Sequence, residues 1–262
     1  MEIEKKIAGV NFDEWIDTEG KKDVEKIIKN KKYSSWLIAF LDILGVKDLI
    51  YKHRNGDEHI AIDIIENMRK IVKDVMSSLD IKYKFEYLSI SDSFVFICEP
   101  QIVSDFVINL ARIQMLILLE CKQLLRGAIT IGDAIMDEEG KHVMGPAYIR
   151  AFLLQENDSI YPRIIIDNCV KREILKIQKK ENFISFDTDK ECFLDYLKIF
   201  MNDTKREVLD IKVLLRREGV LEYLKEYYNK YDEENEEKHN IKQKYGWTIE
   251  YFKRLGVWEN GK

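Results

Sequence analysis

Cysteine, histidine and proline are scarce in this sequence. It contains four cysteines, four histidines and three prolines in 262 residues. The cysteines form no C-x-x-C pair and no histidine-rich segment lies near them, so a zinc site is not expected. We expect them to be small core residues of a reduced, cytoplasmic protein. They are Cys98, Cys121, Cys169 and Cys192.

An excess of positive charge is also missing. Lys and Arg total 42 against 47 Asp and Glu, which gives a formal net charge of −5. This balance disfavours a nucleic-acid partner recruited by overall charge, although it leaves room for a local basic pocket that binds a nucleotide.

Long uninterrupted hydrophobic runs are lacking as well. The most apolar long stretch, from Ile102 to Leu119, is interrupted by polar residues that include Asp105 and Arg112. We therefore expect a buried helix there and not a membrane span. The first six residues are charged and no apolar segment follows them, so no signal peptide is predicted.

The hydrophobic content of 46% is sufficient for a large core. We predict an N-terminal helical arm over 1–33, a main domain over 34–200 and a helical C-terminal extension over 201–262. The extension is predicted because charge rises after residue 203 and apolar residues recur there at helical spacing. The aromatic residues of 245–258 are expected to pack on their own domain or on a dimer mate.

The order of the predicted elements indicates an α+β fold. A hairpin between two helices on one sheet is typical of a ferredoxin-like palm. Either Ser104 or Asp105 is expected to cap the helix that follows the hairpin. Strands are expected at about 35–41, 82–90, 94–98, 124–131, 163–166 and 183–186, and helices over 46–51, 58–78, 104–120, 146–156 and 171–180.

Two of these strands end beside an aspartate. The apolar run from Trp36 to Leu41 is typical of a strand buried on both faces, and it leads into Asp42. Asp92 lies at the predicted tip of the hairpin. Either aspartate alone would equally fit a helix cap or a turn. Together on neighbouring strand ends, they would form the anionic oxygen site that Mg²⁺ or Mn²⁺ prefers and that metal-assisted phosphoryl chemistry uses.

Four segments, in order, resemble the catalytic domain of class III nucleotide cyclases. Phe40-Leu-Asp42-Ile-Leu-Gly45 resembles their F-x-D-I-x-G-F segment, and Ser89-Ile-Ser-Asp92-Ser93 is similar to their I-G-D-S hairpin. The segment Arg126 to Gly132 resembles R-x-G-I-x-x-G, and Val143-Met-Gly145 resembles the start of V-W-G-D-x-V-N. The resemblance covers about Trp36 to Ile166 and is greatest to the divergent bacterial branch that includes the Pycsar pyrimidine cyclases of antiphage defence.

The resemblance implies an enzyme that makes a 3′,5′-cyclic mononucleotide, a second messenger, and pyrophosphate from a nucleoside triphosphate. Two Mg²⁺ or Mn²⁺ ions would be held by Asp42, Asp92 and the carbonyl of Ile43. Amides around Leu44, Gly45 and Val46 would meet the triphosphate. The resemblance also implies a homodimer with its active sites at the interface.

Departures from the family pattern concern the base and the transition state. Leu88 stands where purine cyclases carry a base-selecting lysine, and His142 stands near the position of its acidic partner, which favours a pyrimidine, CTP or UTP. The asparagine and arginine of the family's helix are replaced by Ile149 and Leu153. A transition-state cation would instead come from Arg126, Arg150 or Arg163, among which the sequence does not choose. Arg150 and Arg163 would equally fit surface ion pairs, and Arg126 would equally fit an anchor at the sheet edge.

Two other functions compete with this one. Diguanylate cyclases and CRISPR polymerases carry G-G-D-[DE] on the hairpin, whereas this hairpin has a single acidic residue, Asp92, and no double glycine. A degenerate cyclase-like domain would bind a nucleotide or a partner without turnover, and the missing asparagine and arginine keep that hypothesis open.

Overall fold

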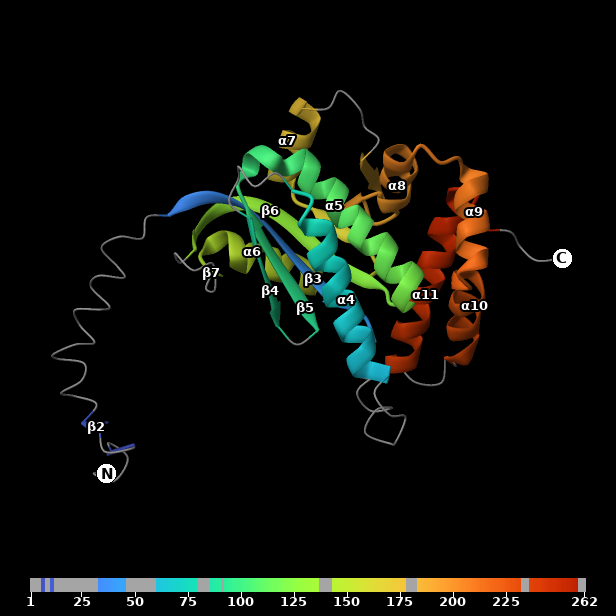
Figure 1. The fold of residues 1–262 in the computed structure, drawn as a ribbon, viewed down its shortest axis with the longest axis horizontal. Helices are drawn as coiled ribbons and strands as arrows, with labels where there is room; N and C mark the ends of the chain where they lie inside the picture. Colours follow the sequence, from blue (N-terminus) through green and yellow to red (C-terminus); the bar gives the residue numbers. More distant parts are fainter. Residues whose placement is uncertain are drawn as a thin grey trace.

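An eight-stranded sheet forms the centre of the protein in a computed structural model (Figure 1). The strand order is β4-β5-β3-β6-β8-β10-β9, and β7 pairs with β6 beside this path. The structure describes residues 6–7, 10–11, 33–45, 60–79, 85–90, 92–136, 143–177, 183–231 and 236–258.

The first half of the sheet is a ferredoxin-like unit. Its elements are β3 (Ser34–Ile43), α4 (Ile60–Met76), β4 (Phe85–Ile90), β5 (Ser93–Cys98), α5 (Val103–Leu116) and β6 (Leu125–Met136). The order β4-β5-β3-β6 is antiparallel throughout, which is the βαββαβ arrangement of that fold. The predicted α+β class and ferredoxin-like palm are therefore confirmed. The helix predicted over 46–51 lies outside the described residues.

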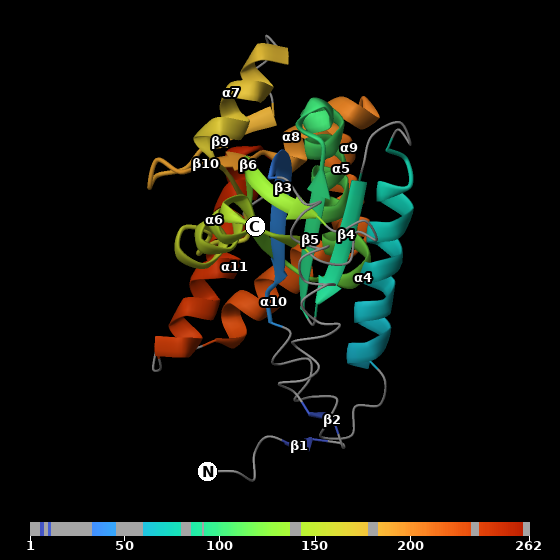
Figure 2. The same ribbon diagram turned by 90° about the vertical axis from the view of Figure 1, so that its left-hand side faces the viewer.

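Strand β3 is buried on both faces, as its apolar run predicts. Side chains alternate between the faces of a strand, so Leu37, Ala39 and Leu41 join the core beneath α4 and α5. Trp36, Ile38 and Phe40 point to the other face, where they pack with residues of α6 (Pro146–Asn157). Figure 2 shows α4 and α6 on opposite sides of the sheet.

The apolar segment Pro100–Cys121 passes through the core. It combines η2 (Pro100–Ile102), α5 and the π-helical η3 (Ile117–Cys121). Among the described residues it is the one segment long and apolar enough to cross a membrane, but 72% of its apolar 18-residue stretch is buried inside the protein. The expected buried helix is confirmed. The predicted cap is wrong, because the N-cap is Ile102, and the preceding turn of η2 already starts the helical backbone.

Strand β6 lies unusually close to β3 at Gly127. A Cβ atom at Gly127 would lie 2.5 Å from the Phe40 carbonyl oxygen, so only glycine fits there. The Gly127 amide donates to the Arg163 carbonyl oxygen at 3.0 Å, which joins β6 to the start of β8. This close approach brings the ends of β3, β6 and β8 together.

The second half of the sheet is added on the far side of β6. β8 (Ile164–Ile166) runs parallel to β6 after β7 (Val143–Met144) and α6, and α7 (Asn168–Ile177) leads to β9 (Ile184–Phe186) and β10 (Cys192–Leu194). β10, a strand of three residues that pairs with both β8 and β9, was not predicted.

The C-terminal residues form α8 (Tyr196–Thr204), α9 (Val208–Arg217), α10 (Val220–Lys230) and α11 (Glu236–Arg254). Their apolar side chains, such as Ile211, Leu224 and Phe252, belong to the same core cluster as β3 and α5. The aromatic residues of α11 pack on their own chain, where Trp247 and Tyr251 contact Phe193 of β10. The predicted intramolecular packing of this aromatic stripe is confirmed.

The N-terminal arm departs from the expected helix where it is described. Lys6–Ile7 (β1) and Val10–Asn11 (β2) form a two-stranded antiparallel ladder. Ile7 and Val10 are β-branched, and such side chains favour extended backbone over helix. Residues 12–32 of the predicted arm lie outside the described residues.

Candidate functional site

Asp42 lies inside the end of β3, one residue from the last strand position. It is paired with Ser93 of β5 and with Arg126 of β6, so it lies between two neighbouring strands. Its side chain is on the face of Phe40, toward α6, and is only 17% exposed. The alternation that buries Phe40 thus brings a carboxylate to the sheet end.

Arg126 is the cross-strand partner of Asp42. Its Nε donates to Asp42 Oδ2 at 2.9 Å, and the Arg126 side chain is 18% exposed. Gln155 and Glu156, near the C-terminal end of α6, lie beside the guanidinium. The Gln155 amide oxygen accepts from Arg126 at 3.1 Å with the amide turned toward it, and Glu156 Oε2 lies 3.7 Å from Arg126 Nη2. Of the three candidate arginines, Arg126 is the one that the fold places on Asp42.

Asp92 lies in the turn next to Asp42. Its carbonyl oxygen accepts from the Ile43 amide at 3.0 Å, which ties the hairpin to the end of β3. The pKa of Asp42 is raised above its ordinary value, mainly by burial. The bond and charge of Arg126 lower that pKa, whereas the negative charges of Asp92 and Glu156 raise it. Three carboxylates, those of Asp42, Asp92 and Glu156, therefore lie around Arg126, an arrangement that a bound cation would stabilise.

The backbone turns at Leu44 and Gly45 directly after Asp42 and Ile43. Gly45 has φ of +84°, a left-handed conformation that favours glycine. The Leu44 amide donates to the Leu124 carbonyl oxygen at 2.9 Å, so this amide is already used inside the protein. Val46, the third predicted triphosphate contact, lies outside the described residues.

Two further predicted site residues, Arg150 and Leu88, have other contacts. Arg150 is 56% exposed on α6 and forms an ion pair with Asp167 at 3.1 Å. Leu88 of β4 packs, partly buried, against the core cluster beneath α6. His142 lies outside the described residues.

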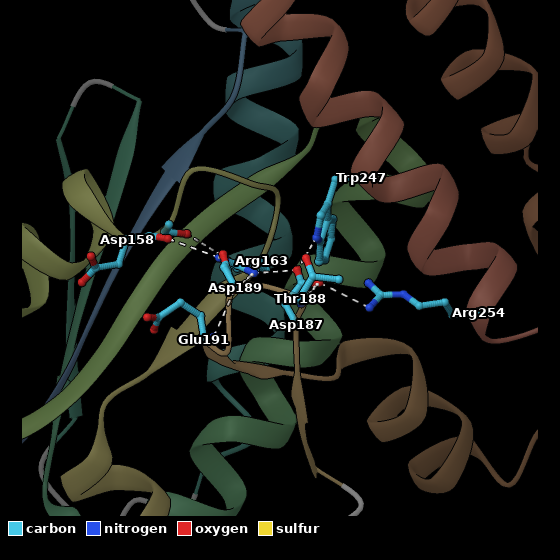
Figure 3. Close-up of polar contacts among 9 residues, drawn as sticks. Asp158, Arg163, Asp187, Thr188, Asp189, Glu191, Trp247 and Arg254 are labelled. Atoms are coloured by element: carbon cyan, nitrogen blue, oxygen red, sulfur yellow. Dashed lines mark hydrogen bonds and ion pairs between the residues drawn. The ribbon is translucent and has the colours of Figure 1, made fainter.

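Arg163 is at the centre of a separate buried network (Figure 3). Its side chain is fully buried, and it forms ion pairs with Asp187, at 2.5 Å, and with Asp189. Asp187 also accepts hydrogen bonds from Trp247 and Arg254 of α11. Burial opposes ionisation of Asp187 and Asp189, but these bonds and the Arg163 charge hold the pKa of both carboxyls below the ordinary value.

Lys244 of α11 is a site residue that sequence reasoning missed. It is half-buried, and its amine lies in the electrostatic field of Asp42, Arg126 and Glu156. It also lines a cavity together with Leu44 and Gly45. Lys244 is 202 residues from Asp42 in the sequence, and no spacing motif relates them; only the packing of α11 against the sheet brings them together.

The donor set at the sheet end fits a hard divalent cation. Two carboxylates, Asp42 and Asp92, lie beside backbone carbonyls, which are the oxygen ligands that Mg²⁺ prefers. Within the described parts of the chain, no group of three or more His, Cys, Asp and Glu side chains forms a metal cluster. An ion held here would therefore depend on two carboxylates, with substrate phosphates and water completing its shell.

Comparisons with known proteins give structural neighbours only. No family model matches this chain, and no curated protein sequence matches it. A bacterial light-regulated adenylyl cyclase aligns over 66% of this chain with a TM-score of 0.47 and 14% identity. The guanylyl cyclase domain of a rhodopsin fusion protein from the aquatic fungus Blastocladiella emersonii aligns over 62% of this chain and 95% of its own length, with a TM-score of 0.44 and 14% identity.

A third neighbour is described as a class III adenylyl cyclase-like ATP-binding protein from Pseudomonas aeruginosa. It aligns over 65% of this chain with a TM-score of 0.46 and 11% identity. The alignments span 57% of the light-regulated cyclase and 40% of the Pseudomonas protein. Likeness at this level assigns no activity, so the functional argument that follows depends on the site.

Proposed function

We propose that this protein is a nucleotide cyclase that converts a nucleoside triphosphate into a 3′,5′-cyclic mononucleotide and pyrophosphate. The observation that carries the proposal is the placement of Asp42, Arg126 and Asp92 at one end of a ferredoxin-like sheet. The motifs around these residues, in the same order along the chain, resemble those of class III cyclases.

The reaction is an intramolecular displacement at the α-phosphorus. The ribose 3′-hydroxyl gives its proton to water, and its oxygen bonds to the α-phosphorus. The bond from that phosphorus to the oxygen that bridges it to the β-phosphorus breaks, and pyrophosphate leaves with that oxygen. Mg²⁺ or Mn²⁺, held by Asp42 and Asp92 with the Ile43 carbonyl oxygen, would supply Lewis acidity and neutralise phosphate charge. The contribution of the chain's own residues is to orient the 3′-oxygen and the α-phosphate for this displacement.

Arg126 is the proposed transition-state cation. It is already fixed by Asp42 and Gln155, so little conformational entropy is lost when it stabilises charge on the α-phosphate. Arg163 and Arg150 are bonded to Asp187 and Asp167 instead. We therefore assign the role that the sequence left open to Arg126.

We propose a pyrimidine substrate, CTP or UTP. Leu88 places an apolar side chain where purine cyclases carry a base-selecting lysine, so that cation is not provided by this position. A cyclic pyrimidine nucleotide would act as a second messenger, and the resemblance to the Pycsar branch makes antiphage signalling the proposed context.

A homodimer is proposed as the active form. Helix α6 exposes Ile149, Phe152 and Leu153, at 56%, 41% and 46% of their surfaces, beside the sheet face that carries Asp42. A second copy that covers these side chains would place its own residues near the site. Light scattering of the purified protein tests this assignment, and a monomer under conditions of turnover would contradict it.

The alternative function is a cyclase-like domain that binds nucleotide without turnover. The exposed Ile149 and Leu153, which replace the asparagine and arginine of the family pattern, favour it. The Pseudomonas neighbour is itself described as an ATP-binding protein.

Incubation with ATP, GTP, CTP and UTP, each with Mn²⁺, separates the two functions. Mass spectrometry of the products is expected to show one cyclic mononucleotide and pyrophosphate, and both are lost in Asp42→Ala and Asp92→Ala. Metal-dependent nucleotide binding without any product would favour the non-catalytic alternative. A linked dinucleotide product would instead indicate a diguanylate-cyclase-like enzyme.

A further inference from the structure

The C-terminal helices form one wall of a small cavity beside the proposed metal site. On one side lie the turn residues Leu44 and Gly45, followed by Gln123 and Leu124 from the segment before β6. On the other side lie Lys244 and a group of tyrosines from α10, α11 and the residue after α10: Tyr223, Tyr227, Tyr231 and Tyr245. We call this cavity the tyrosine pocket.

The tyrosines form a rigid wall. Tyr223 and Tyr227 have ring centroids 4.6 Å apart, and Tyr227 and Tyr245 have centroids 5.4 Å apart. The hydroxyl groups of Tyr223 and Tyr245 are hydrogen-bonded at 3.1 Å. The rings of Tyr223, Tyr227 and Tyr245 therefore form one packed aromatic group along this side of the pocket.

The size of the pocket limits what can enter. Its volume is about 60 Å³, whereas pockets that enclose a whole small molecule measure about 300–1,000 Å³. The tyrosine pocket thus has room for a few waters or one phosphate-sized group, but not for a nucleoside. A ligand as large as a nucleotide can place only one of its ends in the pocket.

Lys244 supplies a positive charge, which would favour a ligand whose end is an anion. Its amine is half-buried and lies near two carboxylates, Asp42 and Glu156, and near the guanidinium of Arg126. Burial and the like charge of Arg126 lower the pKa of Lys244, and the two carboxylates oppose this change. An anion in the pocket would add a favourable partner for the amine, and Lys is a common point-charge ligand of phosphate.

The position of Lys244 is fixed by the buried network around Arg163. Trp247, three residues later on α11, donates to Asp187 (Figure 3). Its ring also stacks on Tyr161, with ring centroids 6.1 Å apart. Arg254, seven residues after Trp247 on α11, also forms an ion pair with Asp187 at 3.3 Å. The helix is therefore held in one register on the sheet, and Lys244 is pre-organised toward the site.

We propose that the tyrosine pocket receives the terminal phosphate of the nucleoside triphosphate beside Lys244, and one phosphate group of the pyrophosphate product after turnover. This inference depends on the proposed function, because it takes the triphosphate to be held at Asp42 and Asp92 and to extend past Gly45. The C-terminal extension is then part of the substrate site, and it provides a phosphate contact from within the same chain.

Calorimetric titration of the full chain with inorganic pyrophosphate and Mn²⁺ tests the inference. Lys244→Met is expected to weaken pyrophosphate binding about tenfold to a hundredfold, as expected when a charged hydrogen bond is lost. Lys238→Met is the matched control, since Lys238 is an exposed lysine of the same helix, and it should bind pyrophosphate like the wild type. Equal melting temperatures of the three proteins would show that the fold is intact.

The outcomes separate this inference from the proposed function. If pyrophosphate binding weakens in Lys244→Met although no triphosphate is turned over by the wild type, the phosphate site stands and the cyclase assignment falls. If the wild type turns over a triphosphate but Lys244→Met keeps the same KM and the same pyrophosphate affinity, the phosphate site is wrong while the cyclase assignment stands. With an active enzyme, the expected result is a KM raised about tenfold in Lys244→Met with a smaller change in kcat.

Discussion

Two arginine–aspartate pairs lie at neighbouring strands of the same sheet, and they differ in surroundings. Arg126 of β6 contacts Asp42 with about a fifth of each side chain exposed, and Asp92, Glu156 and Lys244 lie close by. Arg163, just before β8, is fully buried between Asp187 and Asp189. The residues that follow Asp42, Leu44 and Gly45, line the tyrosine pocket. The Arg163 side chain is covered completely, although its partner Asp187 lines another cavity together with Trp247 and Arg254 of α11.

The carboxyl pKa values show what this difference means. Ionised Asp187 is favoured by the fold, because its pKa is lowered by Trp247, Arg163 and Arg254 in spite of burial. Ionised Asp42 is disfavoured, because burial and the nearby carboxylates outweigh Arg126 and raise its pKa. Asp187 accepts bonds from Trp247, Arg163 and Arg254, whereas Asp42 accepts from Arg126 and lies near two other carboxylates, an arrangement in which a cationic ligand can bind. We therefore propose that the same residue types have a structural role at Arg163 and a chemical role at Asp42.

The largest effect on stability is expected from Asp187→Ala. It leaves Arg163 buried with one carboxylate fewer and removes the anchor of Trp247, so the free energy of unfolding should fall by about 3–5 kcal/mol. Urea denaturation measures this change. Asp203→Ala is the control, because its ion pair with Arg112 is partly exposed and its loss should cost less than about 1 kcal/mol. Equal losses in the two variants would show that the buried network has no special role.

Asp42→Asn is expected to separate activity from stability. Turnover of the preferred triphosphate should fall on the order of 10²–10³-fold, because a carboxylate ligand is lost at the reacting phosphate. The free energy of unfolding should change by less than about 1 kcal/mol, since the fold already disfavours the charge of Asp42. Steady-state kinetics and urea denaturation of the same preparation give both quantities. If the free energy of unfolding instead falls by several kcal/mol while turnover changes little, the Asp42–Arg126 pair has a structural role and the proposed catalytic role is wrong.

The pH dependence of stability should differ between wild type and Asp187→Asn. The lowered pKa of Asp187 contributes stability that is fully present above the ordinary pKa of 3.8 and is lost as the pH falls through the folded value. The stability advantage of the wild type over the variant should therefore be constant near neutral pH and shrink below about pH 4. Thermal denaturation between pH 3 and pH 7 checks this. If the stability difference between wild type and Asp187→Asn stays constant down to pH 3, ionisation of Asp187 is not the source of that difference.

The smallest effect is expected from Arg150→Ala. Arg150 is largely exposed and its pair with Asp167 should contribute less than about 1 kcal/mol. Because Arg126 occupies the site, turnover should change by less than about threefold in Arg150→Ala. A hundredfold loss of kcat would identify Arg150 as the transition-state cation in place of Arg126.

The sheet-end aspartates were predictable because their context is local. An unbroken apolar run predicts the buried strand β3, and the residue that ends it is the polar Asp42. The hairpin between β4 and β5 follows from two β-prone segments separated by a short turn, which places Asp92 beside β3. The ferredoxin-like order then follows from the alternation of helices and strands, since few topologies are compatible with it.

The roles of Arg163 and Lys244 could not be predicted in the same way. Arg163 is bound by Asp187, on a turn whose partner strand β10 has only three residues. Lys244 is one of many lysines in a charged helix, and its sequence neighbours do not distinguish it. Both roles arise from how α11 packs against the sheet, which depends on the sum of many long-range contacts.

Parallel measurement of turnover and thermal stability for Arg126→Met and Arg163→Met tests the account most directly. We predict that Arg126→Met loses turnover at least about a hundredfold with a small change in melting temperature. Arg163→Met should lose several degrees of melting temperature and, in the fraction that stays folded, keep turnover within about tenfold of the wild type. If Arg163→Met instead abolishes turnover in a fully stable protein while Arg126→Met remains active, the catalytic arginine has been assigned to the wrong pair.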